Sequence, residues 1–399
     1  MNITRPLVLA ATLLTLIVSG CSQPSSSQSP VLEPQFGTPT NDRADAVVND
    51  SQRGYIYAGG VSATSGDFNE GNFYLRRYDQ NGSLAWKRLF PVAYMPDTHF
   101  EGRVEGIQLD AAGNIYLGWS RIVGDWYNQE AFIWKLNSAG TLLYKLDAGT
   151  HLRDFEVDAA GNLYVAGGYY GDHPEGANER FFLRKYSPQA QLMWERLRTY
   201  DGDGVLENPA QAIPAPNDIG LASDGSLYAS GYNGNNCCSE EGVPELSKYS
   251  NAGVTLWEKP GFGTVTAAGL NFYLLTPSKA NLQKYDSSGV LRWQRMITGF
   301  STSSLAVDAK LNLYLAGTVN SENDYDFFVR KYTPAGAVSW TYVPKRSVTD
   351  EYATGISAKG SSNVYVAGAA NGTVNGKNSG SYDAFLLRLN AQGQKVWSR

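Results

Sequence analysis

The sequence predicts an all-β fold, a seven-bladed β-propeller whose blades are four-stranded antiparallel sheets. Two observations carry this prediction. A strand-like Tyr-(Val/Leu/Ala)-Ala-Gly segment recurs, followed by a second strand that ends in a basic residue plus Tyr or Leu, and an aromatic residue always stands eight positions further on. A fixed spacing inside units of about 50 residues is typical of propellers. The seven pairs are Tyr78/Trp86, Leu136/Tyr144, Tyr186/Trp194, Tyr249/Trp257, Tyr285/Trp293, Tyr332/Trp340 and Leu389/Trp397.

Each unit is expected to contain four strands, A to D, in chain order. Strand A is short and carries small residues, as in 104–109, and a turn rich in Asp, Gly and Asn, as in 110–114, leads to strand B. Such residues suit hairpin turns, because Asp and Asn tolerate turn geometry and Gly supplies positive φ. Strand C has the same pattern in 73–78, 181–186 and 327–332, and the next turn usually has Gly four residues before the aromatic residue of strand D. Alternation and aromatic content favour strands over helices.

Ring closure is expected to involve both ends of the propeller, which we place at residues 34–399. Trp397 to Arg399 lie in strand D of the seventh unit, and residues 34–39 resemble a continuation of that strand. An open ring would expose two sheet edges. We therefore predict that the N-terminal segment completes the last blade and closes the ring.

The first 20 residues are expected to be an export signal. Arg5 supplies a positive charge, and residues 7–18 form an apolar segment too short to span a membrane comfortably. The string Val18-Ser19-Gly20-Cys21 resembles the lipobox of bacterial lipoproteins, and this resemblance implies cleavage before Cys21, lipid attachment to Cys21 and, with Ser22 next, sorting to the outer membrane. The alternative is an ordinary cleaved signal with an incidental cysteine.

The residue composition and net charge limit the kinds of partner that the chain is expected to bind. Residues 21–33 combine the lipidated Cys21 with a Ser-, Gln- and Pro-rich tether. The net charge is −5, charged residues make up 18%, and no basic block is present, so nucleic acid is not an expected partner. We expect a monomer that meets the membrane through its lipid and binds an envelope protein, a peptide or a glycan.

The repeats resemble the bacterial seven-bladed β-propeller repeat found in many exported proteins. The matching stretches are Asp-x-x-Gly-Asn-x-Tyr-Val-Ala-Gly and Phe-(Leu/Val)-x-Lys-Tyr followed by Gly and Trp, over almost all of residues 34–399. The fifth unit departs most from this pattern. The resemblance implies the fold and an extracytoplasmic location, and it implies no single activity.

Loop lengths predict where binding takes place. The A–B and C–D turns are short and uniform, whereas the B–C and D–A connections are long and differ between units. These two sets emerge on opposite faces of a propeller, here called the turn face and the loop face, and varied loops on a rigid scaffold usually carry binding residues. The alternative is that the loop aromatics pack the loops onto the ring. The candidate ligand-binding residues are Trp119, Trp126, Tyr127, Tyr169, Tyr170 and Tyr232.

Acidic residues recur near the start of the A strands, where they would line the mouth of the central channel. They are Asp45, Glu105, Asp154 and Asp218. An acidic mouth would attract a cation or a basic segment, so these residues form a candidate metal site and calcium is the candidate ion. No other cofactor is expected. The alternative is that the carboxylates cap strand ends.

Two other features are more structural in character. Cys237 and Cys238 are adjacent, and in an oxidising compartment they would form a vicinal disulfide or remain as two free thiols. A basic residue stands before the Tyr or Leu of every pair. Because an active site need occur only once, we predict an architectural role for this repeated set, which comprises Arg77, Lys135, Lys185, Lys248, Lys284, Lys331 and Arg388.

Known catalytic motifs do not stand out. The sequence shows no Ser-His-Asp order, no histidine cluster with metal spacing and no phosphate-binding Gly loop. We expect a non-enzymatic binding or scaffold module, lipid-anchored at the cell envelope, that acts through its loop face. The alternative is an extracytoplasmic lyase or hydrolase with its site at the channel mouth, using carboxylates, His99 or His173 and calcium. A third possibility is a purely structural envelope protein.

Overall fold

The computed structural model divides the chain into two units, Met1–Val31 and Leu32–Arg399. The description below concerns the second unit and covers residues 37–63, 71–90, 102–122, 129–170, 179–200, 213, 215–233, 243–276, 281–321, 324–344, 349–360, 363–372 and 378–399. Several predicted residues lie outside these ranges, namely Cys21, His99, Trp126, Tyr127, His173, Cys237 and Cys238. Within the described ranges, no helix is long and apolar enough to cross a membrane.

The described residues form 28 strands in seven four-stranded antiparallel sheets, which confirms the predicted seven-bladed propeller. The first four blades are β1 (Asp42–Asp50), β2 (Tyr55–Ala63), β3 (Gly71–Asp79), β4 (Leu84–Phe90); β5 (Gly102–Leu109), β6 (Ile115–Ile122), β7 (Gln129–Leu136), β8 (Leu142–Asp147); β9 (His151–Val157), β10 (Leu163–Tyr170), β11 (Glu179–Tyr186), β12 (Leu192–Tyr200); and β13 (Ala215–Leu221), β14 (Leu227–Asn233), β15 (Val243–Tyr249), β16 (Thr255–Pro260).

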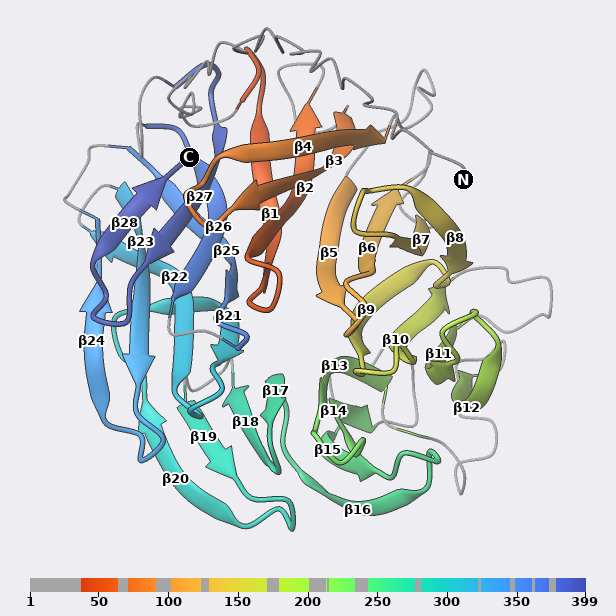
Figure 1. Ribbon diagram of the computed structural model, residues 1–399. Helices are drawn as coiled ribbons and strands as arrows, with labels where there is room; N and C mark the ends of the chain where they lie inside the picture. The colour runs from red at the N-terminus through yellow and green to blue at the C-terminus, as the bar shows by residue number, and fades with distance from the viewer. Residues whose placement is uncertain are drawn as a thin grey trace, which may run out of the picture. The chain divides into compact units, whose positions relative to one another are not determined.

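The remaining three blades are β17 (Thr264–Ala268), β18 (Asn271–Thr276), β19 (Asn281–Tyr285), β20 (Leu291–Met296); β21 (Ser301–Val307), β22 (Leu313–Ser321), β23 (Asp324–Tyr332), β24 (Val338–Tyr342); and β25 (Glu351–Ser357), β26 (Val364–Ala370), β27 (Asp383–Leu389), β28 (Lys395–Ser398). In each blade the four strands pair in chain order. The first strand of every blade lies nearest the centre of the ring (Figure 1).

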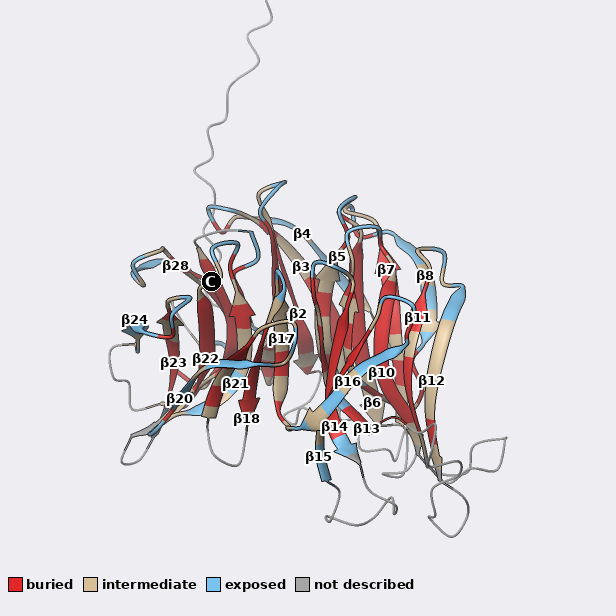
Figure 2. Ribbon diagram, turned by 90° about the horizontal axis from the view of Figure 1, so that it is seen from below, coloured by how far each residue is buried: buried red, intermediate tan, exposed pale blue. Residues whose placement is uncertain are grey.

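Burial follows strand position within the blade. The second strands are buried on both faces, as in β26, where every residue is buried, because each blade packs between two neighbours. The outer strands are largely exposed, as in β20. Figure 2 shows this change from buried inner strands to exposed outer strands. The core therefore consists of apolar layers between adjacent blades rather than one central cluster.

The spacing of eight residues reflects a contact between neighbouring blades. Trp293 in β20 donates its indole N–H to the Pro334 carbonyl in the C–D turn of the next blade, at 3.0 Å. The ring also lies against Gly336, where a Cβ atom would stand 2.8 Å from it. Glycine in the turn thus makes room for the tryptophan of the preceding blade. The same indole-to-turn bond joins Trp194 to Asn251, Trp257 to Ser287, Trp340 to Ala391 and Trp397 to Gln80.

The repeated basic residues serve the same junction. Lys135 Nζ lies 4.9 Å from the centre of the Tyr116 ring in its own blade and donates to the Pro188 carbonyl of the next blade at 3.1 Å. A cation over an aromatic face is stabilised by the ring quadrupole. The predicted architectural role is thereby confirmed for six of the seven residues, and Lys331 Nζ lies 5.3 Å from the centre of the Tyr314 ring in its own blade. Equivalent bonds run from Arg77 to Ser138, Lys185 to Asn251, Lys248 to Ser287, Lys284 to Pro334 and Arg388 to Gln80.

The described residues show no strand of the predicted clasp. The four described strands of the last blade are β25 to β28, residues 37–41 add no strand to that sheet, and residues 34–36 of the predicted clasp lie outside the described residues. The outer position of the blade is filled because Arg399 continues the pairing of β28, exchanging two backbone bonds of 2.8 Å with Leu386. The start of β1 contacts the segment before β27: the Asp42 N–H donates to the Tyr382 carbonyl at 2.8 Å, and the side chain of Asn41, just before β1, accepts the Tyr382 N–H at 3.1 Å.

Side chains close the ring at this junction of blades 7 and 1, here called the seam. Arg399 donates to the Gly82 carbonyl at 2.7 Å, and Thr354 donates to the Ala44 carbonyl at 2.5 Å. Asn49 bonds to Ser357 and, through its side-chain amide, to the Lys359 carbonyl at 2.7 Å. The seam therefore resembles the other six junctions and contains no shared strand within the described residues.

Candidate functional site

The four acidic residues predicted at the channel mouth all lie on inner strands, but at two different positions. Six of the seven inner strands have a β-bulge against their neighbour, which re-aims the side chains at the bulge. Asp45 and Glu105 are the extra residues of their bulges. Asp154 and Asp218 are paired residues next to theirs.

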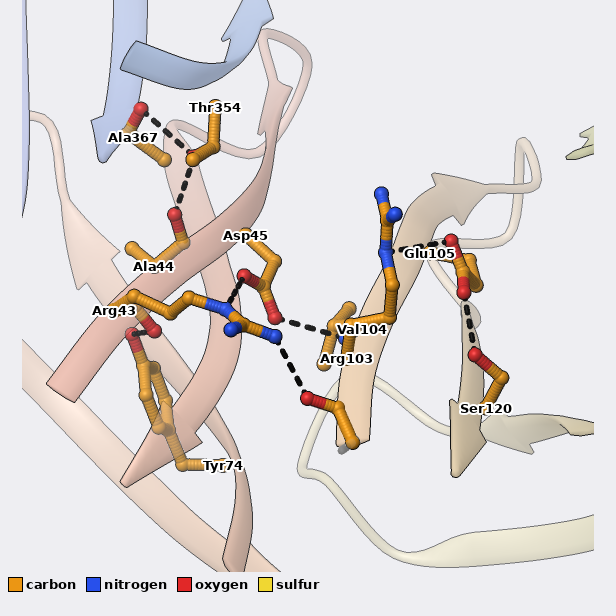
Figure 3. Close-up of polar contacts among 11 residues, drawn as sticks. Arg43, Ala44, Asp45, Tyr74, Arg103, Val104, Glu105, Ser120, Thr354 and Ala367 are labelled. Carbon is orange, nitrogen blue, oxygen red and sulfur yellow. Dashed lines mark hydrogen bonds and ion pairs between the residues drawn. The ribbon is translucent and has the colours of Figure 1, made fainter. Parts of the chain in front are cut away.

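Asp45 joins the first two blades. Its Oδ2 accepts the backbone N–H of Val104 in blade 2 at 2.9 Å, and its Oδ1 accepts from Arg43 Nε at 2.6 Å. Arg43 in turn donates to the Gly102 carbonyl of blade 2 at 2.7 Å. Figure 3 shows these bonds crossing from β1 to β5. The Asp45 carboxylate is thus used to hold two inner strands together.

Glu105 makes its contacts within its own blade. Ser120 Oγ donates to Oε1 at 2.5 Å and Arg103 Nε lies 2.9 Å from Oε2, as Figure 3 shows. Burial raises the pKa of Glu105, while Arg103 and Ser120 oppose that rise. Arg103 therefore neutralises Glu105 much as Arg43 neutralises Asp45.

Asp154 and Asp218 form a carboxyl pair across blades 3 and 4. Asp154 Oδ2 accepts the Ile219 N–H of blade 4 at 3.0 Å, and Asp218 Oδ1 accepts the Val265 N–H of blade 5 at 3.1 Å. Burial raises the pKa of Asp154 to about 6, and burial together with Asp154 raises the pKa of Asp218 well above its usual range. Two carboxyls in one site cannot both ionise cheaply, so this pair retains a proton that isolated aspartates would lose.

Glu156 extends this pair and was missed by the sequence analysis. It stands two residues after Asp154 on β9, and alternate residues of a strand share a face. Burial and the neighbouring Asp154 raise the pKa of Glu156 to about 8, while Lys359 from blade 7 lowers it. This i, i+2 acidic pattern within an inner strand is the sequence feature that indicates the cluster.

The structure brings Asp154 and Asp218 together. The other two predicted carboxylates, Asp45 and Glu105, are each paired with an arginine of their own strand. Among the described residues, no group of three or more His, Cys, Asp or Glu side chains is placed to hold a metal ion. Asp45, Asp154 and Asp218 bind backbone N–H groups of the next blade, which is the strand-capping alternative. Calcium binding at this mouth stays a prediction.

The predicted loop-face aromatics occupy different environments. Trp119 is only 6% exposed and packs among Phe73, Phe132 and Trp134 at ring distances of 4.7, 5.1 and 5.1 Å. It belongs to the core between blades 1 and 2, in line with the packing alternative. Tyr169 packs on Phe182 at 5.6 Å and accepts a bond from Arg184.

Tyr232 is the predicted aromatic that the structure shows at the surface. It is 42% exposed and its ring lies 4.1 Å from that of Phe262, at the loop face between blades 4 and 5. Tyr170 ends β10, and its side chain lies outside the description, as do Trp126 and Tyr127.

A second aromatic group on the loop face was not predicted. Tyr325, Tyr352 and Tyr382, here called the tyrosine row, come from β23, β25 and the residue before β27. Ring centres are 5.8 Å apart between Tyr325 and Tyr352 and 6.1 Å apart between Tyr352 and Tyr382, with interplanar angles of 33° and 39°. The rings therefore follow one another in a shallow row across blades 6 and 7.

Asp350 fixes the tyrosine row. Its Oδ1 accepts the Tyr325 N–H at 3.1 Å and its Oδ2 accepts the Tyr382 hydroxyl at 3.4 Å. The Asn371 side chain accepts the Asp350 N–H at 2.7 Å. Burial raises the pKa of Tyr352 and Tyr382, so both remain protonated donors. The sequence feature that indicates the row is the Tyr-Asp dipeptide at the start of strand C, which occurs in the last two units only.

Known proteins similar to this chain share little sequence with it. No family model matches the chain, and no curated protein matches it. A protein of unknown function from Bacteroides caccae is 12% identical over 72% of this chain and 94% of its own, with a TM-score of 0.42. The β-propeller domain of the Trilobed protease from Pyrococcus furiosus is 9% identical over 88% and 94%, with a TM-score of 0.49. The C-terminal WD40 domain of Sif2 is 10% identical over 84% and 95%, with a TM-score of 0.48.

The chain is thus a seven-bladed β-propeller protein. At these identities and TM-scores, the similar structures assign it no activity. A function has to be sought in what distinguishes its blades from one another.

Proposed function

We propose that this protein is a non-enzymatic binding module that holds an envelope partner on its loop face through the tyrosine row. The observation that carries the proposal is the row itself, in which Tyr325 is 44% exposed and all three rings lie on one face beside Asp350. Exposed tyrosines offer large contact area together with a hydroxyl for hydrogen bonding, and aromatic residues are enriched in binding interfaces.

Lack of repetition supports this role. The contacts that hold the ring together recur at most junctions, as the tryptophan and lysine bonds show. The tyrosine row occurs at one junction only, among the described residues, and its rings contribute no member to the buried core clusters of that region. Residues that do not hold the ring together can change during evolution without loss of the fold, so they can be selected for binding a partner.

A photo-crosslinking residue at Tyr325 is expected to capture a discrete partner from intact cell envelope. The matched control carries the same residue at Val290, which is 52% exposed and lies in a C–D turn on the turn face. An adduct from position 325 and none from position 290 supports the proposal. Equal adducts from both positions, or no adduct from position 325, would contradict partner binding at the tyrosine row.

We propose further that the module is extracytoplasmic and is anchored in the outer membrane by lipid attached to Cys21. The lipobox-like string at residues 18–21 and the likeness of the repeats to those of exported proteins support this. Several acyl chains on one residue would anchor the protein stably.

Cys21→Ser is expected to move the protein from the membrane fraction to the soluble fraction, because the acylated thiol is lost. Fractionation and intact-mass analysis would measure this, with Cys237→Ser as the matched control that keeps the anchor. Unchanged membrane association of Cys21→Ser would rule out anchoring at this residue.

One observation favours an enzyme as the second candidate. Asp154, Asp218 and Glu156 have raised pKa values in one cluster, as acid–base groups often do. A lyase or hydrolase at the channel would turn over envelope glycans or peptides, and Asp154→Asn/Asp218→Asn would abolish that turnover. Turnover that depends on this pair would replace the binding proposal.

A further inference from the structure

A polar pocket of about 290 Å³ lies at the seam, on the turn face and thus opposite the tyrosine row. Its walls come from both ends of the propeller: Asp50, Ser51, Tyr55 and Gln80 from blade 1, with Asn363 and Tyr365 from blade 7. We infer that this seam pocket binds a neutral monosaccharide that contacts the first and last blades together.

Departures from the repeat create the pocket. In blades 2 and 3 the A–B turn closes with a bond across three residues, from Gly113 N–H to Asp110 O and from Gly161 N–H to Asp158 O. In blade 1 the corresponding bond runs from Gly54 N–H to Asp50 O, so the turn is one residue longer. In blade 7, Ala358 replaces the aspartate of this turn.

The most telling group in the pocket is the Tyr365 hydroxyl. In blades 2 and 5 the equivalent tyrosine donates to a turn carbonyl of the next blade, as Tyr116 does to Gly161 at 2.9 Å and Tyr273 to Leu311 at 3.3 Å, whereas in blades 1 and 4 its hydroxyl is buried without a partner. Tyr365 is only 2% exposed, and it lines the pocket from the blade 7 side. A tyrosine hydroxyl that reaches such a pocket can both donate to and accept from a ligand placed there.

The chemistry of the walls favours a neutral, polyhydroxylated ligand. The Asp50 carboxylate is paired with Arg53 at 3.1 Å, so the pocket has little net charge to attract an ion. Hydroxyls of Ser51, Tyr55 and Tyr365 with the amide of Gln80 offer both donors and acceptors. The volume lies at the small end of ligand pockets, which suits one sugar ring with a few waters.

Bridging two blades gives the ligand a structural effect. The described part of the seam contains no shared strand, and a sugar bound to Gln80 and Tyr365 would join blade 1 to blade 7. A ligand that binds only the closed ring stabilises it by mass action. The seam pocket and the tyrosine row lie on opposite faces, so sugar binding at the pocket does not depend on partner binding at the row.

The test is saturation-transfer difference NMR on the purified full chain, with D-glucose, D-galactose and N-acetyl-D-glucosamine as probes. We expect saturable binding of at least one sugar, with a Kd on the order of 1–10 mM for so small a ligand. Tyr365→Phe, which removes only the hydroxyl, is expected to weaken binding about fivefold, and Gln80→Ala similarly.

Tyr228→Phe is the matched control. It removes a buried, unpartnered hydroxyl from the equivalent strand of blade 4, far from the pocket in the chain, and is expected to leave sugar binding unchanged. Melting without sugar shows that each variant is folded. No saturable transfer from any of the three sugars, or equal binding by wild type and Tyr365→Phe, would overturn the inference.

Discussion

Gly336→Ala is expected to lower the free energy of unfolding by about 3 kcal/mol. Gly336 has φ of 79°, a conformation that costs an L-residue about 1–2 kcal/mol. Its new Cβ would also stand 2.8 Å from the Trp293 ring, and overpacking of a tight contact costs about 1–3 kcal/mol. The tryptophan would have to retreat and lengthen its bond to Pro334, which weakens the junction of blades 5 and 6. Urea unfolding measures the change.

Gly299→Ala separates the two causes. Gly299 has a similar φ of 76°, but a Cβ there would meet no atom within 4 Å. Only the backbone cost applies, so a loss of about 1 kcal/mol is expected. If both variants lose the same free energy, contact with Trp293 does not contribute and the account of the eight-residue spacing is wrong.

Glu156→Gln is expected to stabilise the protein at alkaline pH by an amount on the order of 2–4 kcal/mol. Burial and Asp154 raise the pKa of Glu156 from 4.5 to about 8. The folded state therefore binds this proton more tightly than the unfolded state. Its stabilising effect is complete below about pH 4.5 and is lost as the pH rises through about 8. Glutamine imitates the protonated form, so the melting temperature of the variant should exceed that of wild type at pH 9 and match it at pH 4.5.

Glu130→Gln controls for the loss of one negative charge. Glu130 lies at the surface, where it pairs with Arg121 at 2.6 Å, and its replacement should cost less than about 1 kcal/mol. Thermal melts of both variants between pH 4.5 and pH 9 make the comparison. A wild-type profile that rises with pH through 8, or a Glu156→Gln profile parallel to wild type, would contradict the charged cluster around Glu156.

Features that recur in every blade were predictable from sequence, because one physical solution was repeated. The Tyr, Gly and Trp of each unit showed the blade count, and the structure explains their spacing by the contact that Trp293 makes with Gly336. The basic set was assigned an architectural role on the same ground, and Lys135 shows the bond that performs it.

Features that depend on neighbouring blades were less predictable. Edge chemistry predicts a clasp from residues 34–39, but among the described residues the outer position of the last blade is filled by β28 and Arg399. Trp119 was placed on the surface because it stands near a loop, whereas three aromatic rings from β3 and β7 enclose it. The tyrosine row combines residues from three strands, and no spacing in the sequence measures the distance between them.

Because the described strands include none that is shared between blades, the four strands of every blade follow one another along the chain. A duplication whose ends fall in two successive D–A connections would copy a finished sheet together with both halves of its junctions, the turn glycine on one side and the tryptophan on the other. In a propeller whose sheets each take one strand from the neighbouring repeat, a duplication would copy a complete sheet only if its ends fell between two strands of that sheet. In this ring, the stretch of sequence that a duplication would copy therefore coincides with one complete four-stranded sheet.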